Sequence, residues 1–265
     1  MTPRIAGLRE IADRFDAVLL DQFGVLHDGR TAFPGAVACV AALKAAGRRL
    51  AVVTNSGKGA GPNRDRLAAL GFAPDLFDAV ITSGDVCRGA LAALPQSASV
   101  FVIARDGDRS ALAGLALRET ADPREADAVL LAGAEPERMT QDGYRALLAP
   151  AAARGAPLFC ANPDLRMYVR GGTAFGAGAV ARDYAATGAP VRWFGKPHPE
   201  IFAAALAALD TAPARAVMVG DSAAHDVGGA KLAGCAWVLV EGGVYAGAAQ
   251  DVPESGGWAM ASLAW

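Results

Sequence analysis

Short apolar runs alternate along this chain with longer Ala-rich stretches of helical character. The runs have the length and composition of buried strands, and they cover residues 17–20, 49–54, 78–83, 99–104, 127–133, 156–162, 216–222 and 236–243. Among the intervening stretches, 34–47 has Pro34 in its first turn and ends at Gly47, and 63–71 ends at Gly71. Continuous apolar strands separated by helices are typical of a parallel sheet covered on both faces. We therefore predict an α/β fold with a doubly wound parallel sheet.

Composition narrows the class of protein without identifying it. The chain has 265 residues, of which 53% are hydrophobic and 20% charged, so it is a globular chain with room for more than one domain. The net charge of −2 offers no basic surface for nucleic acid. Residues 1–16 are charged throughout, unlike a signal peptide, and no apolar run is long enough for a membrane span. Four scattered cysteines fit free thiols. We expect a cytoplasmic protein that binds neither nucleic acid nor membrane.

Polar residues gather where the predicted strands end. In chain order they are Asp21, Thr54, Asn55, Ser56, Lys196 and Asp221. Each of them alone is compatible with a helix N-cap or a solvated turn. Open parallel sheets, however, bind ligands outside the carboxyl ends of their strands. These strand ends together carry two acids, a hydroxyl with an amide, and one lysine. This combination indicates a site for an anion and a divalent metal.

Four segments give the chain a resemblance to a known family. They are "DQFGVLHDG" (21–29), "VVTNSG" (52–57), "GKPHPEIF" (195–202) and "VGDSAAHDVGGAKLAGC" (219–235), and the last two are the most specific. In this order they resemble the haloacid dehalogenase (HAD) superfamily, and within it the NagD-like branch, subfamily IIA. The resemblance extends over nearly the whole chain. It implies a Rossmann-like HAD core domain at 1–83 and 189–265, with an inserted C2-type α/β cap domain at 84–188.

The resemblance also implies a chemistry, that of a Mg²⁺-dependent hydrolase acting on a small phosphorylated metabolite. Asp21 would be the nucleophile that becomes an aspartyl-phosphate. Mg²⁺ would be held by Asp21, Asp221 and the backbone carbonyl of Phe23. Lys196 would offset the repulsion between carboxylate and phosphate, and Asp226 would orient Lys196 or a metal-bound water.

Substrate contacts are expected from two places. Thr54, Asn55 and Ser56 of the second motif would hold phosphate oxygens beside Lys196. In the expected cap, Asn162 and Asp164 match the subfamily's Asn-Pro-Asp and are candidate substrate-binding residues, although shaping a turn around Pro163 is an alternative. Arg166, Tyr168 and Arg170 follow, and they fit either contacts to the leaving group or a solvated loop.

Phe23 departs from the family pattern, because most HAD phosphatases carry an aspartate there as general acid. Its ring cannot transfer a proton, and such a loss costs roughly 10²–10⁴-fold in rate. His27 and Asp28 are candidate proton donors, or else part of a surface turn ending at Gly29. An aromatic residue here also occurs in the metal-free haloalkanoic acid dehalogenase branch, which lacks the acid present in this chain as Asp221.

Three functions therefore stay open at this point. The first is a phosphatase with an atypical acid/base arrangement. The second is a catalytically impaired phosphate-binding protein, and the third is a C–halogen or C–P hydrolase using the same aspartate nucleophile. The C-terminal segment 245–265, with Trp258 and Trp265, leaves open both core packing and a homodimer interface.

Overall fold

The computed structural model describes residues 2–247, 249–253 and 255–265. It divides into two compact units. Unit 1 comprises the residues up to Thr54, Asn63–Ile81 and Lys196–Trp265, and unit 2 comprises Asn55–Pro62 and Thr82–Gly195. Among the described residues, no helix combines the length and apolarity that crossing a membrane requires.

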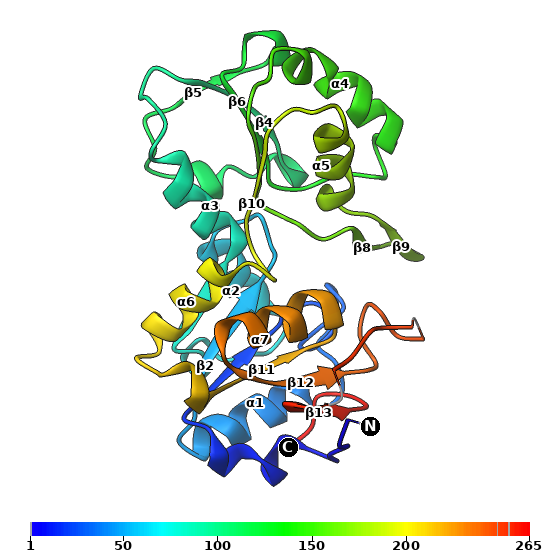
Figure 1. The fold of residues 1–265 in the computed structure, drawn as a ribbon. Coiled ribbons are helices and arrows are strands. Elements are labelled where there is room, and N and C mark those ends of the chain that lie inside the picture. Colours follow the sequence, from blue (N-terminus) through cyan, green and yellow to red (C-terminus); the bar gives the residue numbers. More distant parts are fainter. Residues whose placement is uncertain (1, 248, 254) are drawn as a thin grey trace. The chain divides into compact units, whose positions relative to one another are not determined.

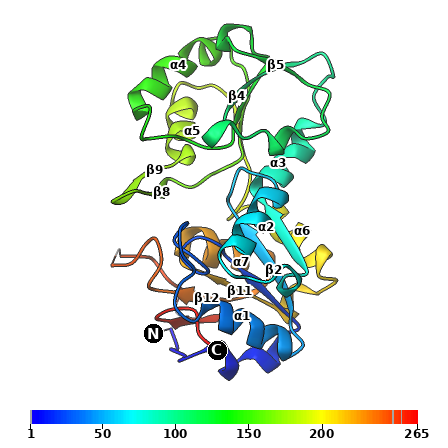
Figure 2. The ribbon, with the colours of Figure 1, turned by 180° about the vertical axis from the view of Figure 1, so that it is seen from behind.

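Unit 1 is built on a six-stranded sheet with the order β13-β12-β11-β1-β2-β3. The strands are β1 (Ala17–Leu20), β2 (Arg49–Thr54), β3 (Ala79–Thr82), β11 (Ala216–Gly220), β12 (Ala236–Val240) and β13 (Gly257–Met260). Pairing is parallel from β13 through to β2. The helices are α1 (Ala36–Ala45), α2 (Ala60–Ala69), α6 (Pro199–Ala208) and α7 (Gly228–Ala233). Figures 1 and 2 show α1 and α2 on one face of the sheet and α6 and α7 on the other, so the predicted doubly wound architecture is confirmed.

Unit 2 holds a five-stranded parallel sheet with the order β10-β7-β6-β4-β5. Its strands are β4 (Ser99–Ile103), β5 (Arg118–Thr120), β6 (Ala128–Leu131), β7 (Leu158–Cys160) and β10 (Val191–Trp193), and its helices are α3 (Ser83–Leu91), α4 (Gln141–Ala153) and α5 (Ala177–Ala186). Val129 and Leu131 of β6 pack with α4 and α5, whereas Leu130 packs in a second cluster with α3. This alternation explains why β6 is apolar at every position. An antiparallel hairpin, β8 (Arg166–Val169) and β9 (Gly172–Phe175), completes the unit.

Each predicted strand is present within its apolar run, but several short strands are missing from the prediction. β5 and β10 are three residues each and partly exposed, and β8 and β9 form an isolated hairpin, so none of them has a continuous apolar run. β13 belongs to the C-terminal segment and pairs with β12 at the edge of the sheet. Its Trp258 packs edge-on against Phe15, with ring centroids 6.1 Å apart. This part of the C-terminal segment therefore packs on the core of unit 1.

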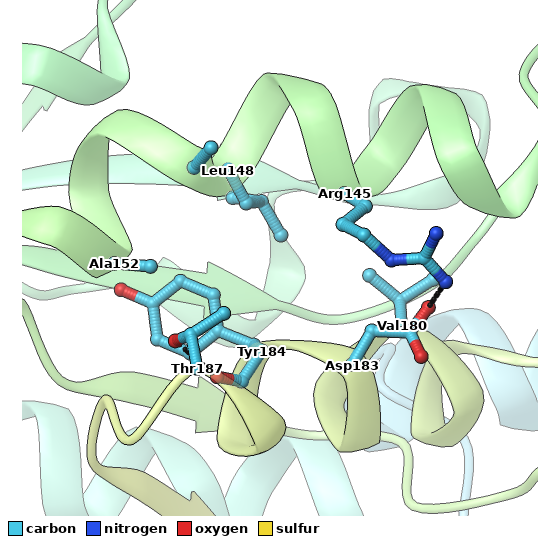
Figure 3. A pocket seen from close by; sticks show the side chains of 8 residues that line it. Arg145, Leu148, Ala152, Val180, Asp183, Tyr184 and Thr187 are labelled. Atoms are coloured by element: carbon cyan, nitrogen blue, oxygen red, sulfur yellow. Dashed lines mark hydrogen bonds and ion pairs between the residues drawn. The ribbon is translucent and has the colours of Figure 1, made fainter.

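A shallow groove lies between α4 and α5 of unit 2 (Figure 3). Apolar side chains such as Leu148 and Val180 line it, and the Arg145–Asp183 ion pair, 3.1 Å long, lies at one end. Tyr184 in the same groove donates its hydroxyl hydrogen bond to the Ala156 carbonyl at 2.7 Å. None of the predicted site residues lines this groove, so the candidate chemistry lies elsewhere.

Candidate active site

The predicted strand-end residues of unit 1 meet at one edge of its sheet. β1 pairs on one side with β11 and on the other with β2, with Leu20 opposite both Val219 and Val52. Parallel strands in this register bring their carboxyl ends to the same edge. Asp21, Thr54 and Asp221 therefore share that edge, and all three are buried.

Lys196 joins this edge from the loop that precedes α6. Its Nζ lies 2.6 Å from Asp21 Oδ1 and 2.7 Å from Asp226 Oδ1, and the residue is only 2% exposed. Burial by itself lowers the pKa of Lys196, but the carboxylates of Asp21 and Asp226 together outweigh burial and raise it. Asp226 Oδ2 also accepts the Ser222 backbone N–H at 3.0 Å. Both oxygens of Asp226 are thus engaged, which suits a residue that orients the lysine.

Asp221 is held by parts of the chain that the motifs do not include. Its Oδ2 accepts a hydrogen bond from the Val244 backbone N–H. Gln250 spans the adjoining turn, because its Nε2 donates to the Asp221 carbonyl at 3.0 Å and its Oε1 accepts the Ala223 N–H at 2.6 Å. Sequence reasoning missed Gln250, since a glutamine in an atypical C-terminal segment carries no motif signal.

Glycine is required where the backbone approaches Asp221 most closely. A Cβ added at Gly24 or at Gly243 would overlap Asp221 Oδ2, and Gly24 also has a φ of +90°. Gly24 lies in the first motif and Gly243 follows β12, so two separate loops enclose one carboxylate. The position of Asp221 is therefore set by backbone packing as well as by hydrogen bonds.

The acids fit a hard divalent cation. One carboxylate oxygen each from Asp21, Asp221 and Asp226 lies within 4.8 Å of the others, and all three residues are buried. Lys196 supplies one positive charge against three carboxylates. Burial, and after it the neighbouring Asp21 and Asp226, raise the pKa of Asp221 to about 8, so the ionised form of this carboxyl is disfavoured without a further positive charge. Mg²⁺ binds carboxylate oxygens and would neutralise the excess of negative charge. Both oxygens of Asp226 are engaged, one by Lys196 and the other by the Ser222 N–H, so Asp21 and Asp221 are the expected ligands.

Phe23, where an aspartate was expected from the family pattern, lies within an aromatic and cationic cluster. Its ring meets His27 edge-on with centroids 4.5 Å apart, and the Arg66 Cζ lies 5.5 Å from the Phe23 ring centroid. His27 is fully buried, and its Nδ1 accepts the Gly29 N–H at 2.9 Å. Burial and then the Arg66 charge lower the pKa of His27 to about 4. The imidazole is therefore neutral at pH 7 and carries its proton on Nε2.

Asp28, the other candidate proton donor, forms a turn. Its Oδ1 accepts the backbone N–H groups of Arg30 and Thr31, each at 2.8 Å. The Thr31 and Arg30 hydrogen bonds hold the pKa of this carboxyl below its ordinary value. Asp28 is consequently ionised at neutral pH, and the surface-turn interpretation describes it better than that of a proton donor.

The remaining predicted residues lie in unit 2, where the second motif is hydrogen-bonded to the Asn-Pro-Asp segment. Asn55 Nδ2 donates to Asp164 Oδ1 at 2.7 Å, and the Asp164 N–H donates to Asn162 Oδ1 at 3.1 Å. Ser56 Oγ accepts the Lys58 N–H at 3.3 Å. The Asn-Pro-Asp segment thus forms the expected turn and in addition contacts the second motif. Arg166 donates to Thr173 Oγ1 across the β8–β9 hairpin at 2.6 Å.

Comparisons with known proteins agree with this arrangement. Residues 18–118 match the family model described as haloacid dehalogenase-like hydrolase, and residues 193–264 match the one described as HAD-hydrolase-like. A haloacid dehalogenase-like hydrolase from Brucella suis 1330 is 31% identical, with a TM-score of 0.88 over 98% of this chain and 99% of that one.

Two further solved structures are similar. Glycerol phosphate phosphatase Rv1692 from Mycobacterium tuberculosis, in complex with magnesium, is 28% identical, with a TM-score of 0.71 over 92% of this chain and 71% of that one. NagD from Escherichia coli K-12 is 25% identical, with a TM-score of 0.70 over 94% and 96% of the two chains. Motifs, fold and comparisons agree that the chain belongs to the haloacid dehalogenase-like hydrolase family, as a phosphatase-type hydrolase of its NagD-like branch, subfamily IIA.

Proposed function

We propose that the protein is a Mg²⁺-dependent phosphatase that transfers the phosphoryl group of a small phosphorylated metabolite to Asp21 and then to water. The observation that carries this proposal is the buried cluster in which Lys196 Nζ lies 2.6 Å from Asp21 Oδ1, beside Asp221. A carboxylate held against a buried lysine ammonium group is a suitable nucleophile for phosphorus. The similarity to a phosphatase in complex with magnesium supports the same assignment.

Each of the side chains of unit 1 would have its own role in the reaction. An Asp21 oxygen attacks phosphorus while the ester oxygen leaves with the electron pair of the broken P–O bond, which gives an aspartyl-phosphate. Water then attacks the phosphorus, releasing phosphate and regenerating Asp21. Lys196, oriented by Asp226, offsets the repulsion between the Asp21 carboxylate and the phosphate dianion. Bound Mg²⁺, held by Asp21, Asp221 and the Phe23 carbonyl, would add positive charge at the phosphoryl oxygens.

Phosphate and substrate contacts would come from Thr54 and from residues of unit 2. Thr54 ends β2 and is buried at the sheet edge. Asn55 and Ser56 follow it in the chain, and Asn162 and Asp164 would contribute the turn that hydrogen-bonds Asn55. We assign unit 2 the role of the family's inserted cap, expected at 84–188. The substrate class is proposed only as a small phosphorylated metabolite.

A screen of phosphorylated metabolites with and without Mg²⁺ tests the proposal. The wild-type protein should release phosphate only with Mg²⁺, and Asp21→Asn should abolish release while its circular dichroism spectrum is unchanged. Asp13→Asn, at an exposed acid, is the matched control and should keep full activity. Phosphate binding without turnover would instead favour the catalytically impaired phosphate-binding protein. The argument for that alternative is that residue 23 is a phenylalanine and not an acid. Metal-independent halide release would favour a dehalogenase.

A further inference from the structure

The first-motif loop contains no side chain suited to protonate a leaving group at pH 7. Phe23 has no proton to give, Nδ1 of His27 accepts the Gly29 N–H, and the Asp28 carboxylate accepts the backbone N–H groups of Arg30 and Thr31. The P–O bond would then break with a full negative charge developing on the leaving oxygen. An alkoxide is a poor leaving group unless that charge is stabilised.

Arg66 places a cation next to the Phe23 ring. It lies on α2, is half-buried, and its guanidinium Cζ is 5.5 Å from the Phe23 ring centroid. In the described part of the chain, no carboxylate forms an ion pair with it. A guanidinium stays charged at all relevant pH values and offers a fork of N–H donors suited to oxyanions.

We propose that Arg66 is a catalytic residue that binds the leaving oxygen and stabilises its negative charge, in place of the family's general acid. This inference rests on the proposed phosphatase function. In the step, the bond between an Asp21 oxygen and phosphorus forms and the ester P–O bond breaks. The leaving group takes the electron pair and departs as an oxyanion against the Arg66 guanidinium. It takes a proton from water after departure, so no proton moves in the chemical step.

The position of Phe23 fits this role. The Arg66 guanidinium lies over the half-buried Phe23 ring, and an electrostatic contact is stronger beside an apolar surface than in open water. A carboxylic acid at position 23 would instead form an ion pair with so near an arginine and lose its proton. The combination of phenylalanine at 23 and arginine at 66 is therefore consistent with charge stabilisation and inconsistent with proton donation.

The test is the dependence of kcat/KM on leaving-group acidity. Phosphate esters ranging from 4-nitrophenyl phosphate through phenyl phosphate to an alkyl phosphate are assayed with Mg²⁺. The proteins compared are wild type, Arg66→Gln, Arg66→Lys and the control Arg64→Gln, which changes an exposed arginine of the same helix. Arg66→Gln should lower kcat/KM for the alkyl ester about 10- to 100-fold more than for 4-nitrophenyl phosphate. Arg66→Lys should recover part of the loss, and Arg64→Gln should match the wild type.

Three results would overturn the inference. An equal loss of kcat/KM for all esters in Arg66→Gln would mean that Arg66 only supports the fold or substrate binding. If the glutamine variant proves unstable, the same comparison is made with Arg66→Lys. We expect a solvent isotope effect near one on wild-type hydrolysis of the alkyl ester. A substantial effect would show that a proton is transferred in the chemical step. If the wild type hydrolyses no ester in the series with Mg²⁺, the proposed phosphatase function itself fails, and the inference fails with it.

Discussion

Acidification should destabilise unit 1 through His27. Burial and the Arg66 charge lower the pKa of this histidine from its ordinary 6.5 to about 4 in the folded protein. The unfolded chain, with the ordinary pKa, binds more protons than the folded one between these two values. Stability therefore rises with pH in this window, so the His27 contribution is complete above pH 6.5 and is lost as the pH falls toward 4.

The two pKa values give the size of the effect. At pH 5 the unfolded histidine is almost fully protonated, while the folded one is protonated to about a tenth. The difference corresponds to about 2 kcal/mol lost between pH 7.5 and pH 5, since each pKa unit is worth about 1.4 kcal/mol. A single buried imidazole thus accounts for a sizeable part of the stability of an ordinary domain.

Urea unfolding at pH 7.5 and pH 5 measures this loss, with His27→Gln as the comparison. The glutamine variant keeps a polar side chain but cannot titrate, so all other groups cancel in the difference between the two proteins. The wild type should lose about 2 kcal/mol more than the variant over this interval. Equal losses in both proteins, or an NMR titration placing the His27 pKa near 6.5, would refute the reasoning and restore His27 as a candidate general acid.

Two further predictions concern the surroundings of Asp221. Gln250→Ala should raise the Mg²⁺ dissociation constant about tenfold in calorimetric titration, because it releases the turn that carries this ligand, whereas alanine at the exposed Gln96 should change nothing. Gly24→Ala should cost several kcal/mol in thermal unfolding, since its Cβ would overlap the carboxylate. Gly47→Ala has a similar positive φ but no atom within 4 Å, so it should cost only about 1 kcal/mol, and equal costs would contradict the argument.

The sequence by itself determined the architecture and which polar groups gather at the edge of the sheet in unit 1. β1, β2 and β11 could be recognised because strands buried on both faces are apolar throughout, and this is a local property. Asp21 and Thr54 could be placed at the same edge because parallel strands end together. The short strands could not be predicted, because three partly exposed residues that pair with a distant segment leave no local pattern.

Only the tertiary structure decided how the candidate site is held together. Lys196 meets Asp21 across 175 positions of sequence, and Gln250 reaches Asp221 across 29, so no local pattern carries either contact. The charge state of His27 likewise depends on burial and on Arg66 of another element, which is a property of three-dimensional surroundings. Motifs identify which groups are present, whereas their protonation states and partners depend on distances and solvent exclusion that arise only when the chain folds.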